Sequence, residues 1–260
     1  TTIHSDIACD LCYNYNFFVS FIFTKIWLHY IKKFDAVVVI SDQLKKIYEC
    51  KLKSISRVYN GIDITYRPDK NDPSIIAQIN KFRDLNYKII GSYAYLTRIK
   101  GLEQLIKVLE KRKDLAVVII GEGEAKNELI ELSRTLNVID RTLFLDYLPT
   151  PYNYLSLFDV YAMCSRSEGF GLAAVEATLM QTPVVCSNIS IFKEIFDDTK
   201  VSFFELDNIS SLLESINIAI STIGKLKAKV ALNYSLNNFS GYKMASNYLD
   251  IYSNLLNGKI

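Results

Sequence analysis

The sequence predicts an α/β protein in which a parallel sheet is covered by helices on both faces. From Tyr87 onward, short apolar runs alternate with amphipathic helices, which is typical of buried parallel strands joined by helical crossovers. The predicted strands are 89–93, 115–120, 142–145, 160–164, 183–186 and 201–204. The predicted helices are 101–111, 124–136, 151–158, 191–196, 209–220 and 241–256. With 260 residues the chain can form one large or two modest domains.

The N-terminal part follows the same alternation. The predicted strands there are 1–3, 37–40 and 57–59, and the predicted helices are 17–31 and 42–50. The polar stretch 66–73 contains two prolines, so it predicts a linker and a domain boundary. We therefore expect a first domain over 1–65, a second over 66–240 and a closing helix in 241–260.

The composition excludes several classes of protein. A net charge of +2 is too small to indicate a nucleic-acid partner. Cys9 and Cys12 form one C-x-x-C pair without a second pair or a histidine cluster, so no metal site is expected. Cys164 and Cys186 lie in apolar runs and are expected in the core, and the five thiols fit a reducing compartment.

The aromatic segment 17–31 is open to two interpretations. It is shorter than the roughly 20 residues that span a bilayer, and Lys25 and His29 interrupt it. The pattern favours a core helix. The alternative is an interfacial helix with Trp27 and Tyr30 at the level of the lipid headgroups.

The segment from Ser167 to Glu176 carries the strongest functional signal. Glu168 and Glu176 flank a Gly-Phe-Gly turn between a predicted strand and a predicted helix. Glycines let a ligand approach the backbone, and helix N-termini attract phosphate, whereas carboxylates accept hydrogen bonds from sugar hydroxyls. The pattern indicates a ligand that is partly phosphate and partly polyol, such as a sugar nucleotide. Solvated glutamates beside an ordinary strand-to-helix connection remain the alternative.

Several motifs occur in a characteristic order. They are 34–41, Asn60-Gly61-Ile62-Asp63, Lys100-Gly101, Gly121-Glu122-Gly123, Glu168 to Glu176, Pro183-Val184-Val185, and Phe239-Ser240 with the final helix. Together they resemble the retaining glycosyltransferase family 4 branch of the GT-B enzymes. The resemblance implies a complete C-terminal Rossmann-like domain and the remaining part of an N-terminal Rossmann-like domain. The final helix would cross back to the N-terminal domain. Because the first part of that domain is not in the sequence, the chain is expected to be a fragment.

The resemblance implies roles for individual residues. Lys100 would stabilise the donor diphosphate, Glu168 and His4 would contact the transferred sugar, and Glu176 would bind the ribose. The donor would also meet backbone or side-chain groups of Gly91, Arg98, Gly121, Gly123, Tyr147, Phe170, Gly171 and Leu172. Alternatives stay open for these residues. Gly91 and Gly121 could serve tight packing, and Tyr147 could stack on the base or crowd it. Surface positions are the alternative for Lys100, Arg98 and Glu176, and His4 could be an ordinary polar residue at a strand end.

The resemblance also predicts the function. It implies transfer of a hexose from a nucleotide-diphosphate sugar to a glycan or lipid-linked acceptor, with no metal and no resident cofactor. The setting would be bacterial surface polysaccharide, lipopolysaccharide O-antigen or capsule, made in the cytoplasm with peripheral contact to the inner membrane. The alternatives are a GT-B sugar-nucleotide epimerase and a truncated, inactive chain that still binds nucleotide.

Overall fold

The computed structural model describes residues 1–64, 69 and 71–257, and it forms two compact units. The smaller unit comprises Thr1–Asp63, Glu168–Gly171 and Asn237–Ile260, and the larger unit comprises Ile64–Ser167 and Leu172–Leu236. The boundary expected between 65 and 66, and residues 66–68 and 70 of the expected linker, lie outside the described residues. Each unit is described below by itself.

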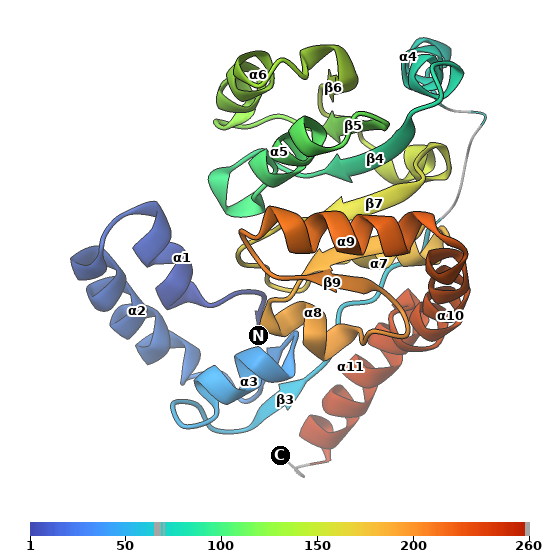
Figure 1. Cartoon of the computed structure of the whole chain (residues 1–260). Helices are drawn as coiled ribbons and strands as arrows, with labels where there is room; N and C mark the ends of the chain where they lie inside the picture. Colours follow the sequence, from blue (N-terminus) through green and yellow to red (C-terminus); the bar gives the residue numbers. More distant parts are fainter. Residues whose placement is uncertain (65–68, 70, 258–260) are drawn as a thin grey trace. The chain divides into compact units, whose positions relative to one another are not determined.

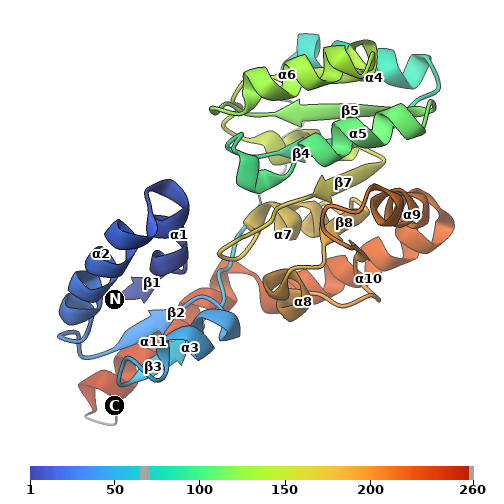
Figure 2. The ribbon, with the colours of Figure 1, turned by 60° about the vertical axis from the view of Figure 1, so that its left-hand side comes forward.

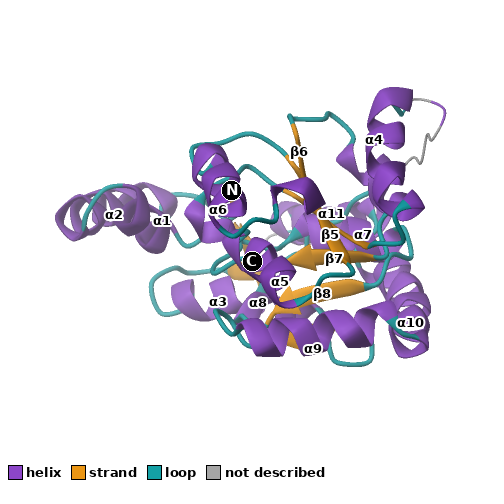
Figure 3. Ribbon diagram, turned by 45° about the horizontal axis from the view of Figure 1, so that its top comes forward, coloured by secondary structure: helices purple, strands orange, loops and turns teal. Residues whose placement is uncertain are grey.

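The larger unit is built on a six-stranded sheet in the order β6-β5-β4-β7-β8-β9, and every neighbouring pair is parallel. The strands are β4 Lys88–Tyr93, β5 Leu115–Ile120, β6 Thr142–Leu145, β7 Val160–Met163, β8 Val184–Ser187 and β9 Ser202–Phe204. Figure 3 shows β7 and β8 as neighbouring arrows that point the same way. The predicted α/β class with a parallel sheet is confirmed.

Helices cover both faces of this sheet (Figure 1). The helical elements are α4 Pro73–Asp84, η2 Arg98–Lys100, α5 Glu103–Lys111, α6 Lys126–Thr135, η3 Ile139–Arg141, η4 Pro151–Leu157, α7 Leu172–Leu179, α8 Ser190–Ile195, α9 Ile209–Ile220 and α10 Thr222–Asn238. On one face, α5 and α9 contribute Leu105 and Ile216 to a fully buried apolar cluster with Val117 of β5. Burial of this kind is the main stabilising contribution to such a layered fold.

The chain order creates a switch point in the sheet. The chain passes from β4 outward to β5 and β6, then returns to β7 beside β4 and continues outward to β8 and β9. The loops that follow β4 and β7 therefore lead away in opposite directions. In open parallel sheets, ligands bind at such a point, beyond the carboxyl ends of the strands.

Gly91 lies in the middle of β4 and provides space for a neighbouring ring. A Cβ atom at this position would lie 1.9 Å from Cδ2 of Phe158, which is buried. The Phe158 ring therefore fills the space that Gly91 leaves. This agrees with the interpretation that Gly91 serves tight packing.

The smaller unit contains a three-stranded parallel sheet in the order β1-β2-β3 (Figure 2). Its elements are β1 Thr2–Ile3, α1 Ile7–Asn14, α2 Phe17–Ile31, β2 Val37–Val39, α3 Asp42–Tyr48, β3 Ile55–Arg57 and α11 Gly241–Leu256. Helix α11 packs Ile251 against Val38 and Val58 on one face of the sheet. The Ser41 hydroxyl accepts a hydrogen bond from Leu44 N at 3.1 Å, which caps α3.

Helix α2 has the predicted bounds, but it is not buried as the favoured interpretation of a core helix expected. Phe17 is 77% exposed and Phe18 is 71% exposed, whereas Ser20 and Ile31 are its buried residues among those described. The expectation of a core helix is wrong for this structure, because α2 packs along α1 and leaves much of its apolar surface uncovered. Across the part of the chain that the structure describes, no helix is long and apolar enough to cross a membrane.

The packing at Gly91 gives the first testable prediction. Gly91→Ala is expected to lower the free energy of unfolding by about 2 kcal/mol, since the new methyl group would overlap the Phe158 ring. Urea unfolding measures this cost in the parent and in a Phe158→Ala background, which removes the overlapping ring atoms. The cost should fall to less than about half in that background. Equal costs in the two backgrounds would contradict the packing role.

Candidate functional site

The loop after β4 holds Lys100 at the end of the short helix η2. Gly101 follows it in the left-handed conformation, with φ of 62°. A Cβ atom at Gly101 would lie 2.3 Å from the carbonyl oxygen of Cys164, just beyond β7. The Lys100 loop is thus packed against the end of β7, at the switch point of the sheet.

A buried amide, Gln104, fastens this loop to two others. Its Nε2 donates to the carbonyl oxygens of Gly101 at 3.1 Å and Cys164 at 3.2 Å. Its Oε1 accepts from the backbone N–H of Asp207 at 2.9 Å. One side chain therefore joins the loops that follow β4, β7 and β9. Gln104 is only 1% exposed, and both its Nε2 and its Oε1 are hydrogen-bonded, as buried polar groups require.

Arg166 connects the same three loops by charge-assisted contacts. Its Nη1 donates to the carbonyl oxygen of Arg98 at 2.8 Å. Its Nη2 donates to Oε1 of Glu103 at 2.6 Å and also pairs with Asp207. Such an arginine fork fixes the geometry of the loops as well as contributing energy.

Glu176 lies in the first turns of α7 and is oriented by Tyr93 at the end of β4. The Tyr93 hydroxyl donates to Oε2 of Glu176. Burial raises the pKa of the Glu176 carboxyl above its usual value of 4.5, and the hydrogen bond from Tyr93 acts in the opposite direction. Tyr161 donates to the carbonyl oxygen of Tyr93 at 3.3 Å, and the two rings lie 5.0 Å apart. The carboxylate is thus held by a small tyrosine network.

The Gly-x-Gly turn after β5 wraps around the loop after β4. Gly121 and Gly123 have φ of 143° and 149°, which favour glycine. Added Cβ atoms would lie 2.0 Å from the carbonyl oxygen of Ala94 and 2.4 Å from that of Leu96, respectively. Close packing of two loops explains both glycines. A donor contact at this turn remains a prediction.

Two further predicted side chains lie at the surface. Arg98 forms a two-pronged pair with Glu128, with its Nη2 2.7 Å from Oε1 and its Nε 3.1 Å from Oε2. Tyr147, in the loop after β6, is 67% exposed. Arg98 therefore lies at the surface, as one of the two interpretations of the sequence expected. Contacts of Arg98 and Tyr147 with the donor stay predictions.

The smaller unit brings the first half of the signature beside His4. A Cβ atom at Gly169 would lie 2.4 Å from the carbonyl oxygen of His4, so Glu168 is held next to the end of β1. Phe170 is 3% exposed and packs with the rings of Tyr59 and Phe239, at centroid distances of 5.7 and 5.6 Å. Because the side chain is packed, only the backbone of Phe170 is left for the expected donor contact, which stays a prediction.

The second half of the signature begins the helix. Gly171 has φ of 86°, and Leu172 is the first residue of α7 in the larger unit. Free N–H groups at a helix start suit an anion. This placement agrees with the strand, glycine turn and helix that the sequence predicts.

The structure adds three residues that the sequence reasoning missed: Tyr93, Gln104 and Arg166. Tyr93 could have been suspected from its place at the end of a predicted strand. Gln104 and Arg166 carry no local signal, because their partners lie far away in the sequence. Within the described residues, no group of three or more His, Cys, Asp or Glu is arranged as metal ligands.

The comparisons identify the class of protein. The family model described as glycosyl transferases group 1 matches residues 75–231, so the chain belongs to this family and is a glycosyltransferase by descent. A relative from Escherichia coli, the O-antigen biosynthesis glycosyltransferase WclY, is 34% identical over 98% of this chain and 71% of the relative. Another E. coli relative, UDP-Gal:alpha-D-GlcNAc-diphosphoundecaprenol alpha-1,3-galactosyltransferase, is 26% identical over 83% of this chain and 58% of the relative.

Solved structures support the same fold. HepE from Anabaena, solved with UDP and glucose, superposes with a TM-score of 0.82 over 97% of this chain and 71% of HepE, at 19% identity. At this identity the likeness shows the fold, and it confirms the predicted GT-B class.

The three-loop connection through Gln104 yields a second prediction. Gln104→Leu should lower the free energy of unfolding by about 1–3 kcal/mol, because it removes three hydrogen bonds and leaves the buried carbonyl of Cys164 without its partner. Gln78→Leu on the exposed face of α4 is the matched control and should change it by less than about 0.5 kcal/mol. Chemical denaturation of the variants measures both values, and equal losses would argue against the role of Gln104.

Proposed function

We propose that this protein is a retaining glycosyltransferase that moves a hexose from a nucleotide-diphosphate sugar to a glycan or lipid-linked acceptor. The observation that carries the proposal is the gathering of Lys100, the Gly-x-Gly turn and the N-terminus of α7 at the switch point of a group 1 glycosyltransferase sheet. The names of the relatives support a role in surface polysaccharide, O-antigen or capsule, and support a lipid-linked acceptor.

In this proposal catalysis rests on positioning and on charge. The Lys100 ammonium stabilises the diphosphate as it leaves the sugar, and the backbone N–H groups at the start of α7 hold the phosphates. Glu176 accepts hydrogen bonds from the ribose, while Glu168 and the exposed His4 face the transferred sugar. The configuration at the anomeric carbon is retained, and no metal ion or resident cofactor takes part, so activity should survive a chelator.

Calorimetric titration with UDP-, GDP- and ADP-sugars tests the donor site. One donor should bind, and Lys100→Met should weaken its affinity at least tenfold, because the diphosphate loses its cationic partner. Lys107→Met on the exposed face of α5 is the matched control and should leave affinity unchanged. Failure of all three donors to bind would sink the proposal. A labelled donor incubated without acceptor separates transfer from epimerisation, since only an epimerase alters the sugar under that condition.

We further propose that α2 rests on the inner face of the cytoplasmic membrane, as the interfacial alternative for this segment implies. The exposed large apolar residues of α2 are Phe17, Phe18, Phe21, Ile22, Phe23, Ile26 and Tyr30. Cations accompany them: Lys25 Nζ lies 4.1 Å from the Phe21 ring centre, and Lys33 Nζ lies 5.0 Å from that of Tyr30. Aromatic rings beside lysines suit the boundary between anionic headgroups and acyl chains.

Vesicle sedimentation tests this contact. The protein should sediment with vesicles that contain phosphatidylglycerol, and Phe18→Ser with Phe21→Ser should reduce the bound fraction several-fold. Tyr242→Ser, which removes an exposed aromatic residue from α11, is the control and should not change it. Equal binding of the double variant and the parent would contradict the contact.

A further inference from the structure

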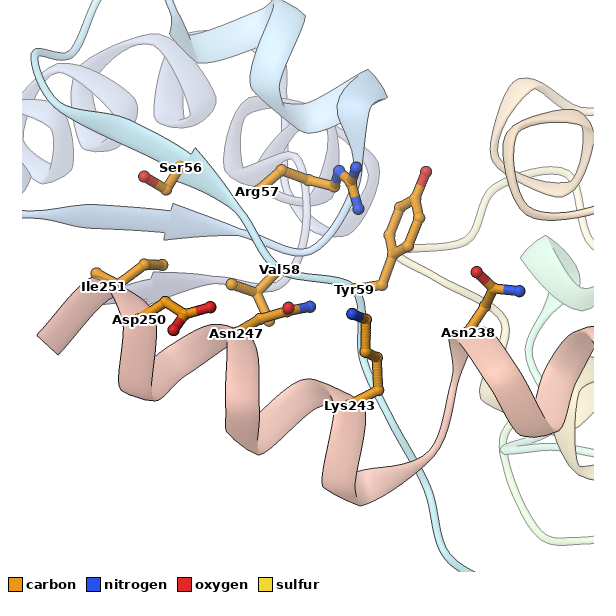
Figure 4. A pocket seen from close by; sticks show the side chains of 9 residues that line it. All are labelled: Ser56, Arg57, Val58, Tyr59, Asn238, Lys243, Asn247, Asp250 and Ile251. Atoms are coloured by element: carbon orange, nitrogen blue, oxygen red, sulfur yellow. The ribbon is translucent and has the colours of Figure 1, made fainter. Parts of the chain in front are cut away.

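A polar cavity of about 570 Å³ lies in the smaller unit (Figure 4). One wall is the end of β3 with the segment that follows it, the other is α11, and the last turn of α10 closes one side. The lining residues are Ser56, Arg57, Val58, Tyr59, Asn238, Lys243, Asn247, Asp250 and Ile251. None of these is among the residues expected to bind the donor. The volume is in the range of cavities that hold small ligands.

The Arg57 side chain lies on the opposite side of β3 from α11 (Figure 4). The guanidinium of Arg57 stacks on the Tyr59 ring, with its Cζ 3.8 Å from the ring centre. Its Nε donates to Oδ1 of Asp42 at 3.1 Å. Arg57 is therefore paired within the protein, and the α11 wall supplies the charged and amide side chains that face the cavity.

The α11 wall presents polar groups on one face of a helix. Lys243, Asn247 and Asp250 are spaced by four and three residues, which places them in one row. Figure 4 shows Lys243 and Asn247 rising from α11 toward the opposite wall. Within the described residues, the side chains of these three make no hydrogen bond or ion pair, so they can bind a ligand without first breaking a contact.

The chemistry of the lining indicates an uncharged ligand. Arg57 is paired with Asp42 away from the cavity, and the two charged side chains of α11, Lys243 and Asp250, carry opposite charges, so the cavity has no excess charge to attract an ion. It offers donors, acceptors and amides that serve as both, together with the apolar side chains of Val58 and Ile251. A sugar ring matches this mixture, because it carries hydroxyls that donate and accept around apolar C–H faces.

We propose that this cavity binds a neutral saccharide, such as a segment of a glycan, at a site separate from the donor site. The lining residues alone support this site, which is independent of the proposed transfer reaction. A second sugar site on a glycosyltransferase would keep a glycan near the enzyme between reactions, by raising its effective concentration.

Saturation-transfer NMR on the full chain, without donor, tests the site. The probes are maltotriose, chitotriose and globotriose, with 3′-sialyllactose as the charged comparison. At least one neutral trisaccharide should bind with a Kd in the millimolar range, and Asn247→Ala should weaken it at least fivefold. Asn254→Ala, an exposed residue of α11 outside the cavity, is the matched control and should have no effect. Asp250→Asn provides a second cavity variant should Asn247→Ala fold poorly.

The outcomes separate this site from the donor site. Lys100→Met should leave trisaccharide binding intact even if it abolishes donor binding. Three results would overturn the proposal: no neutral trisaccharide binds at 20 mM (roughly the weakest useful range), only the sialylated probe binds, or binding is unchanged in both cavity variants.

Discussion

The geometry of the switch point depends on the hydrogen bonds of one buried amide. Gln104 is the contact through which the loops after β4, β7 and β9 are fixed to one another. Arg166 reinforces the same connection with its charged fork. Lys100 lies between Arg98 and Gly101, whose carbonyl oxygens accept these hydrogen bonds. Its backbone position is therefore set by residues that need not touch a ligand. A buried, fully paired polar network rigidifies its surroundings, and a partly paired one destabilises them.

The glycines of this edge follow from the same constraint. Gly101 lies against the backbone of Cys164, and Gly121 lies against that of Ala94, at separations that leave no room for a Cβ atom. Loops fastened this closely can only be made where side chains are absent. Glycine motifs therefore mark the site in the sequence even where the glycine itself packs against protein, and Gly91 with Phe158 shows the same effect inside a strand.

The sequence predicted the parallel α/β fold because strand and helix periods alternate clearly along the larger unit. The bounds of α2, α9 and α11 agree with those expected, since each is a long periodic segment. Helices α1, α4 and α10 were missed. Helix α4 begins at Pro73 with Asp72 as its N-cap, so the proline and polar residues expected to form a linker in fact start a helix. Helix α10 lacks a marked apolar face. Partners of Gln104 lie 60 and 103 residues away, and no local pattern reports such pairing.

The two glutamates of the Glu168 to Glu176 segment belong to different structural units. Glu168 belongs to the smaller unit, where its neighbour Phe170 is anchored between Tyr59 and Phe239. Glu176 belongs to the larger unit, where Tyr93 holds it. The eight-residue spacing thus joins two carboxylates that are positioned by independent packing, with a left-handed glycine between them. A single sequence motif can thus contribute one carboxylate to each of two structural units. Each carboxylate is then positioned by the packing of its own unit before the two can act on one ligand.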